Sequence, residues 1–141
     1  MGTNEKQHRL ISIFLNLSLE EKYEKIITMG RALPILPPSA RSEKNLVRGC
    51  QSLLYLDTEL RGDLIYFNAD SEALISKGLA ALLIEVYSGE SPEALFKEPP
   101  FFLKEIGLHQ ALSPARSNGL ASLFKKMQEE AFLMVQALNN G

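Results

Sequence analysis

The chain has 141 residues, 45% of them hydrophobic and 23% charged, and its 15 basic and 17 acidic residues give a formal net charge of −2. This composition is close to that of an average soluble domain, so we expect one domain spanning residues 1–141 with its own core. The basic residues are scattered along the chain, which disfavours nucleic-acid binding. The apolar runs are too short to cross a bilayer and the polar start differs from a signal peptide, so we expect a cytoplasmic protein that does not contact membranes.

Two short helices are predicted near the start of the chain. The first, over 7–14, is indicated by apolar residues at helical spacing: Leu10, Ile11, Phe14 and Leu15. The second begins at Ser18, where Glu21 three residues later completes the pattern of a capping box, and it should end near Gly30. The two helices together predict a helical hairpin.

A proline-containing loop and a β-hairpin are predicted next. The segment 33–45 contains three prolines, which restrict the backbone and disfavour regular structure. The apolar runs 52–59 and 64–68 are separated by a short glycine-containing turn, which is typical of two antiparallel strands.

The second half of the chain is predicted to be helical. A long central helix should begin at Asp70 and Ser71 and end before Gly89, with this apolar set: Leu74, Ile75, Leu79, Leu82, Leu83 and Val86. A short helix should begin at 91–93, and a last one at Ser113 and Pro114, with one apolar face: Leu120, Leu123, Phe124, Met127, Ala131 and Met134. The order of elements predicts an α+β fold in which several helices pack on a small antiparallel sheet of about three strands.

Few kinds of chemistry are open to this sequence. One cysteine cannot form an internal disulfide, and together with His8 and His109, which lie far apart in sequence, it is a poor basis for a metal site. The chain has neither of the common glycine-rich phosphate-binding loops. We therefore expect no metal and no cofactor, and any reaction must depend on single side chains such as Cys50.

Cys50 has two interpretations from its immediate surroundings. Free cysteines are often small buried hydrophobic residues, and Cys50 could be one of them. Alternatively, Gly49 lets the backbone turn sharply, Arg48 could favour the thiolate, and a predicted strand follows, which together suit a presented nucleophile.

Three runs of the sequence form an ordered set of motifs: NLVRGCQS at 45–52, ADSEA with KGL at 69–79, and LSPARSNGL at 112–120. Together they resemble the motifs of the SufE family, the sulfur-accepting partners of cysteine desulfurases that contain pyridoxal phosphate (PLP), and the first run resembles the family's cysteine loop. The chain departs from the family at three positions, where the family often has Trp, His and Ser: Tyr55, Ala111 and Ala115. Ala111 removes a titratable group, and His109 cannot be assumed to replace it.

The resemblance implies a persulfide carrier rather than an enzyme that turns over a small substrate. A SufS-like cysteine desulfurase would pass sulfur to Cys50 and be stimulated by the chain, which would hand the sulfur to an iron–sulfur scaffold. PLP would belong to the partner, and the carrier would be a monomer or a weak homodimer. Residues expected to support Cys50 in its loop and site are Arg48, Gly49, Gln51, Ser52, Asp70 and Arg116.

Finer expectations concern individual side chains. Asp70 is most simply a residue that starts a helix, whereas Arg116 is unfavourable in a first helical turn and is expected to contribute to docking or to stabilise charge near Cys50. The glycine at 119 suggests close packing against another backbone. In the free protein the sulfur should be sheltered by the 33–38 loop and the helix beginning at Ser113, with Gly49 as the hinge.

Two other classes of function remain open. A thiol hydrolase or transferase would use Cys50 with His109 as its base, since His8 lies in a terminus expected to fray. A purely structural binding module would keep Cys50 in its core. Replacing His109 should abolish the activity of a thiol enzyme but not that of a carrier, and replacing Cys50 should leave every function of a structural module intact.

Overall fold

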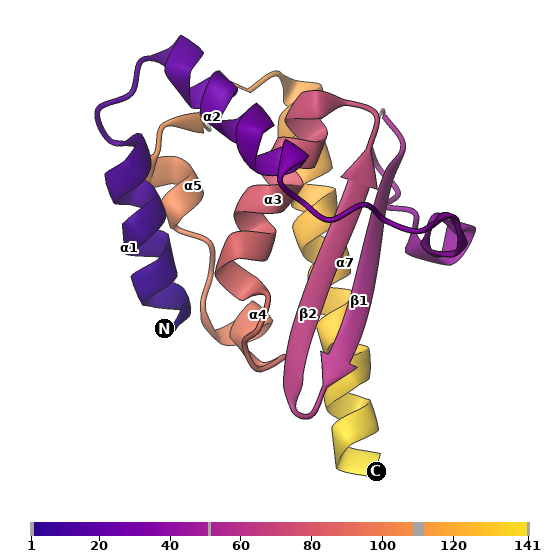
Figure 1. Cartoon of the computed structure of the whole chain (residues 1–141). Helices are drawn as coiled ribbons and strands as arrows, with labels where there is room; N and C mark the ends of the chain where they lie inside the picture. Colours follow the sequence, from indigo (N-terminus) through magenta and orange to yellow (C-terminus); the bar gives the residue numbers. More distant parts are fainter. Residues whose placement is uncertain (1, 51, 109–111, 141) are drawn as a thin grey trace.

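The computed structural model describes residues 2–50, 52–108 and 112–140 and has the α+β architecture expected from the sequence (Figure 1). Helices α1, α2 and α3 span Thr3–Phe14, Leu19–Arg31 and Leu74–Tyr87, and strands β1 and β2 span Leu54–Arg61 and Leu64–Ser71. The remaining elements are two 3₁₀ turns and three helices: η1 (Pro38–Ala40), η2 (Glu43–Asn45), α4 (Ala94–Lys97), α5 (Phe102–Glu105) and α7 (Pro114–Asn140).

Helix α1 is longer and better anchored than the sequence indicated. The buried Gln7 donates from Nε2 to the carbonyl of Pro99 at 3.2 Å and accepts at Oε1 from the amide of Phe102 at 3.1 Å. The expectation that the terminus around His8 would fray is therefore wrong. Leu15, the last of the four apolar residues, is 64% exposed because the helix ends at Phe14.

The capping box of α2 is confirmed. Ser18 Oγ accepts from the amide of Glu21 at 3.2 Å, and the amide of Ser18 donates to Glu21 Oε1 at 2.9 Å. Two orphan amides of the first turn are satisfied in this way, which fixes where the helix begins.

Strands β1 and β2 form the predicted antiparallel hairpin. The register pairs Leu54 with Ser71 at one end and Arg61 with Leu64 at the other, so the connecting loop has two residues, and its first, Gly62, has φ of 64°. A positive φ at this position is usual in such hairpins, because the turn must follow the twist of the strands.

The expected third strand is not present in the described part of the chain, whose sheet has two strands. Its closest equivalents are single bridges, Leu46 to Tyr55 and Ile65 to Glu90. The segment before Leu46 forms η1 and η2 instead, consistent with its three prolines.

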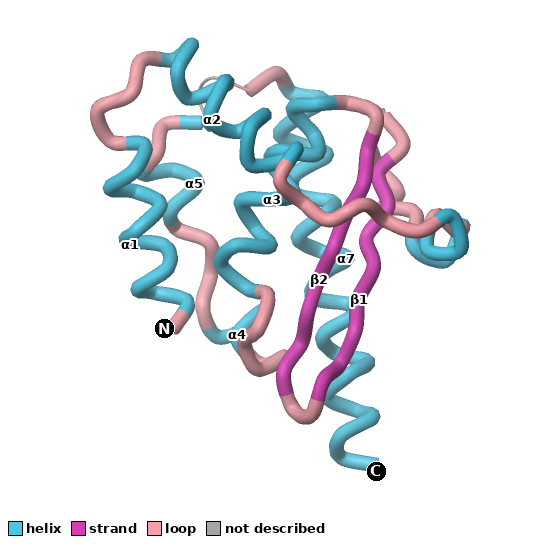
Figure 2. Tube along the Cα trace, viewed as in Figure 1, coloured by secondary structure: helices cyan, strands magenta, loops and turns pink. Residues whose placement is uncertain are grey.

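Helix α3 lies in the middle of the fold (Figures 1 and 2), between α1 and α2 on one side and the hairpin and α7 on the other. Nine of its residues are buried: Gly78, Leu79, Ala80, Ala81, Leu82, Leu83, Ile84, Val86 and Tyr87. Its crossing with α2 is close, because a Cβ at Gly30 would lie 2.7 Å from the amide nitrogen of Gly78. The expected central helix is confirmed, except that Leu74 in its first turn is 46% exposed.

The start of α3 was predicted too early. Asp70 and Ser71 are the last residues of β2, and the helix begins at Leu74. Ser71 Oγ donates to the carbonyl of Leu53 at 2.7 Å and accepts from the amide of Ala73 at 3.2 Å. The hydroxyl therefore closes the strand and shapes the turn before the helix.

Helix α7 begins as predicted, because Ser113 Oγ accepts from the amide of Arg116 at 3.3 Å and Pro114 is the first helical residue. The expected apolar face is confirmed: Leu123, Met127 and Ala131 are buried, and Leu120, Phe124 and Met134 pack against the core. It lies against α3, α4 and β1. No helix of the described ranges combines the length and the apolar character that crossing a membrane requires.

Candidate functional site

The loop that carries Cys50 is held against α7 by a glycine contact. Gly49 has φ of +93°, a conformation that side chains disfavour, and a Cβ built on it would lie only 2.5 Å from Ser122 Oγ. Both the backbone angle and the packing therefore require glycine at this position, and the expected sharp turn before Cys50 is present.

The thiol of Cys50 is half-buried and rests on the first turns of α7. Its sulfur lies 3.7 Å from the carbonyl oxygen of Gly119, to which the S–H donates a weak hydrogen bond. A Cβ on Gly119 would lie 3.4 Å from the same sulfur. The close contact suggested by this glycine therefore exists, but it is made with the cysteine sulfur rather than with another backbone.

Burial raises the pKa of the Cys50 thiol above its ordinary value, because the charged form loses solvation. Arg48 was expected to favour the thiolate, but its guanidinium pairs with Glu43 at 3.0 Å and its side chain is 72% exposed. In this arrangement burial favours the neutral thiol over the thiolate, and no described cation next to Cys50 opposes that effect.

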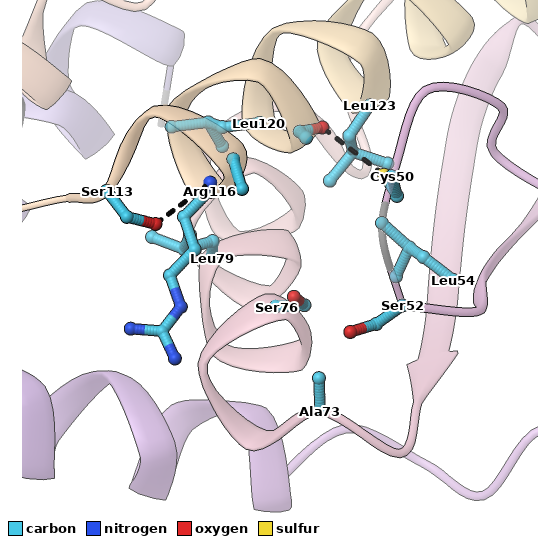
Figure 3. A pocket seen from close by; sticks show the side chains of 12 residues that line it. Cys50, Ser52, Leu54, Ala73, Ser76, Leu79, Ser113, Arg116, Leu120 and Leu123 are labelled. Carbon is cyan, nitrogen blue, oxygen red and sulfur yellow. Dashed lines mark hydrogen bonds between the residues drawn. The ribbon is translucent and has the colours of Figure 1, made fainter.

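Cys50 lies in the wall of a cavity of about 380 Å³ (Figure 3), formed by the segment around Cys50, the start of α3 and the start of α7. The wall contains hydroxyls, one guanidinium and leucine side chains. Its residues are Cys50, Ser52, Leu54, Ala73, Ser76, Leu79, Ser113, Ala115, Arg116, Gly119, Leu120 and Leu123.

The structure places Arg116 in the same cavity wall as Cys50, from which it is 66 positions distant in sequence. Figure 3 shows the two side chains on opposite sides of the cavity, with the Arg116 guanidinium extending beside Leu79. Among the described residues Arg116 has no carboxylate partner within salt-bridge distance. Its charge is thus available to an anion in the cavity or to a docked protein.

Asp70 lies outside the cavity wall. Its carboxylate pairs with Arg41 at 2.6 Å and with Lys77 at 3.3 Å, so it joins the end of β2 to the 3₁₀ segment and to α3. Burial alone would raise the pKa of Asp70, but Lys77 and Arg41 outweigh it and hold the pKa below its ordinary value. The geometry gives Asp70 a structural task.

The remaining expectations concern Gln51, His109 and the 33–38 loop. Gln51 and His109 lie outside the described residues. The 33–38 loop was expected to shelter the sulfur, but it contributes no residue to the cavity wall, and the carbonyl of Pro34 accepts from Asn68 Nδ2 at 3.2 Å instead. Leu36 of this loop is buried and Leu33 packs against the core, whereas Ile35 is 88% exposed.

Sequence reasoning missed one polar group of the wall, Ser76. It lies between the two halves of the second matched run, ADSEA and KGL, and only its place in the first turn of α3 brings it to the cavity. In the described ranges no group of three or more His, Cys, Asp or Glu residues could hold a metal ion.

The amino-acid sequence matches a known protein family. Residues 8–131 match the model of SufE, the Fe–S metabolism associated domain. The chain belongs to the SufE family. The resemblance of the three runs is thereby confirmed, and membership supports a role in iron–sulfur metabolism.

Relatives of this SufE-family chain match over most of its length. An uncharacterized SufE-like protein of Rhizobium etli is 38% identical over 117 residues, 79% of each chain. One of Synechocystis is 32% identical over 124 residues, 86% of this chain and 78% of that protein. A SufE-like protein of Arabidopsis thaliana, described as chloroplastic/mitochondrial, is 33% identical over 131 residues, which are 89% of this chain but 34% of the plant protein.

The fold has a solved counterpart. The solution structure of a hypothetical protein from Thermus thermophilus matches with a TM-score of 0.78 and 26% identity, over 93% of this chain and 96% of that chain. The arrangement of the hairpin and the helices therefore occurs in a solved structure.

Proposed function

We propose that the chain accepts sulfur on Cys50 from a PLP-dependent cysteine desulfurase, stimulates that enzyme, and passes the sulfur to an iron–sulfur scaffold. The Cys50 thiolate attacks the terminal sulfur of a persulfide on the donor, a new S–S bond forms, and the donor leaves as a thiolate. The exchange needs no external oxidant or reductant. The second transfer repeats the step with Cys50 as the leaving thiolate.

The observation that carries the proposal is the place of the Cys50 sulfur in the wall of a cavity. A carrier must keep a bound persulfide from stray thiols and oxidants, and a half-buried sulfur among leucines and serines meets that need. The cavity has ample space for one more sulfur atom. The absent Cβ of Gly119 leaves the space beside Sγ free.

Having one cysteine also suits a carrier. A second thiol nearby would attack the persulfide, form an internal disulfide and release sulfide. With a single cysteine in the whole sequence, this loss within one chain is impossible.

Arg116 is proposed to oppose the negative charge of the persulfide or to contact the docked donor. A persulfide anion in a partly buried cavity needs a nearby cation, because screening by water is reduced there. The Arg116 side chain lies in the wall opposite Cys50, and its guanidinium is proposed to turn toward the persulfide once this forms.

Gly49 is the proposed hinge of the loop. In the resting form the raised pKa of Cys50 keeps the thiol unreactive, so transfer requires a more exposed form of the loop. The donor must stabilise that exposed form through contacts that the resting form lacks. Glycine offers no side chain to oppose the change in backbone angles.

The proposal assigns PLP to the donor and gives the chain no cofactor or small substrate of its own. We place its action in the cytoplasm, where cellular thiols keep a lone cysteine reduced, and expect a monomer or weak homodimer. The competing thiol-hydrolase interpretation depends on His109, and no observation in the described residues favours it.

The proposal is tested by measuring alanine formation from L-cysteine by a cysteine desulfurase, with and without this chain. Wild type should raise the rate, whereas Cys50→Ser should still bind in a pull-down but lose most of the stimulation. His109→Ala is the control, because a carrier should keep its effect and a thiol enzyme should lose it. Full stimulation by Cys50→Ser would overturn the role of Cys50.

A further inference from the structure

A second cleft, of about 400 Å³, lies between the middle of α7 and the segment that runs from η2 toward Cys50. Its lining residues are Glu43, Lys44, Leu46, Arg48, Ser122, Lys125, Lys126 and Glu129, none of which lines the cavity that contains Cys50. We call it the basic cleft.

The basic cleft is positively charged although the whole chain is not. Its lining has four cationic side chains against two carboxylates, whereas the chain carries a formal charge of −2. Lys126 pairs with Glu130 at 3.6 Å, but the amines of Lys44 and Lys125 are exposed and have no carboxylate partner within salt-bridge distance among the described residues. These two charges are open to a ligand.

The basic cleft and the cavity that contains Cys50 share two elements, the loop that carries Cys50 and helix α7. Ser122, in its lining, is the residue against which Gly49 packs, and Gly119 one turn earlier accepts the hydrogen bond from Cys50. Lys126 Nζ also donates to the carbonyl of Lys44 at 3.1 Å, tying η2 to α7. A ligand in the cleft therefore touches both elements whose contact holds Cys50 in its resting place.

We propose that the basic cleft docks an acidic segment of the sulfur donor, close to the donor's reactive cysteine. The proposal rests on the proposed function and adds the place and the charge of the docking contact. The donor is favoured over the sulfur acceptor because Cys50 is the attacking thiolate only in the first transfer, and the cleft borders the packing of Gly49 on Ser122 that keeps this thiol half-buried.

The composition of the cleft favours a polypeptide over a nucleic acid. Glu43 and Glu129 lie in its lining and would repel a continuous phosphate backbone, and none of the described lining residues is an aromatic one on which bases could stack. An acidic peptide segment with spaced carboxylates can contact Lys44 and Lys125 while keeping its charges away from Glu43 and Glu129. Such charge pairs mainly raise the rate of encounter, and salt weakens them.

The test compares Lys44→Glu/Lys125→Glu with wild type in desulfurase stimulation. The concentration giving half-maximal stimulation should rise about tenfold at low salt, with an unchanged maximum, and the difference should shrink as salt screens the charges. Lys97→Glu/Lys104→Glu is the matched control, because it makes the same charge change at exposed positions of α4 and α5. Lys44→Gln/Lys125→Gln should give an intermediate effect.

A poly-glutamate peptide should compete with the donor on wild type but not on Lys44→Glu/Lys125→Glu. Equal behaviour of this variant and its control at every salt concentration would overturn the inference, as would competition by single-stranded RNA but not by the peptide. Failure of wild type itself to accept sulfur would instead reject the proposed function, so the two failures are distinguishable.

Discussion

Gly119 controls the space beside the sulfur of Cys50. Glycine inside a long helix costs stability, yet here a methyl group would lie 3.4 Å from Sγ, in the wall of the cavity. Gly119→Ala should therefore raise the free energy of unfolding by up to about 1 kcal/mol and slow sulfur acceptance, because the methyl group occupies the space a second sulfur needs. Chemical denaturation and persulfide transfer from a desulfurase measure the two effects.

The matched control is Asn118→Ala, at an exposed neighbouring position of α7 that does not line the cavity. It should also favour the helix but leave transfer at the wild-type rate. Unchanged transfer in Gly119→Ala would show that the persulfide does not extend into this part of the cavity.

At the same scale, the sequence identifies the candidate residue, Cys50, but not all of its surroundings. Cys50 and Arg116 could be named from the runs that resemble the family, and the structure brings both to one cavity. The role of Ser76 in the cavity wall and the existence of the basic cleft could not be predicted from the sequence, because both depend on how α3 and α7 are rotated relative to the Cys50 loop. The thiolate-favouring role expected of Arg48 is not supported because Glu43, five residues before it, pairs with its charge.

At the scale of elements, Asp70 joins three segments: the end of β2, the segment between η1 and η2 that contains Arg41, and helix α3. Its pairs with Arg41 and Lys77 are partly buried, with 19% of its side chain exposed, so they are less screened than surface pairs. Asp70→Asn should lower the free energy of unfolding at neutral pH by about 1 kcal/mol. Chemical denaturation as a function of pH measures this difference.

The pH dependence has a definite sign. The folded pKa of Asp70 lies below the ordinary value of 3.8, so its contribution to stability is present above that value and is lost as the pH falls through the folded pKa. Wild type and Asp70→Asn should therefore converge in acid, and the variant should still accept sulfur at neutral pH. A stability difference that persists in acid, or loss of transfer in the folded variant, would contradict a structural role for Asp70.

Element boundaries were predictable where local chemistry sets them. The starts of α2 and α7 follow from hydroxyls that cap them, at Ser18 and Ser113. The predicted start of α3 was wrong because Asp70 and Ser71 are residue types that can either start a helix or end a strand. Their pairing with β1 makes them the end of β2. The prediction of a third strand was wrong for a similar reason. Leu46 and Glu90 each form a single bridge to the hairpin, and no local signal in the sequence shows that the pairing stops after one residue.

At the scale of the whole molecule, the segment carrying Cys50 contributes to two different surfaces. Cys50 lines a cavity with hydroxyls, leucines and Arg116, which is proposed to shelter a persulfide, and Arg48 lines the basic cleft. Helix α7 contributes to both, and its contacts with α3 and β1 fix it in the core. The fold thus supplies a support on which the proposed movement of Cys50 can be confined to a short loop.

The central claim, that Cys50 carries sulfur, is tested most directly by the intact mass of the protein after incubation with a cysteine desulfurase and L-cysteine. We predict a gain equal to one sulfur atom, located on the peptide that contains Cys50, removed by a reductant and absent from Cys50→Ser. No gain in mass while the desulfurase is turning over, or an equal gain in Cys50→Ser, would contradict the account.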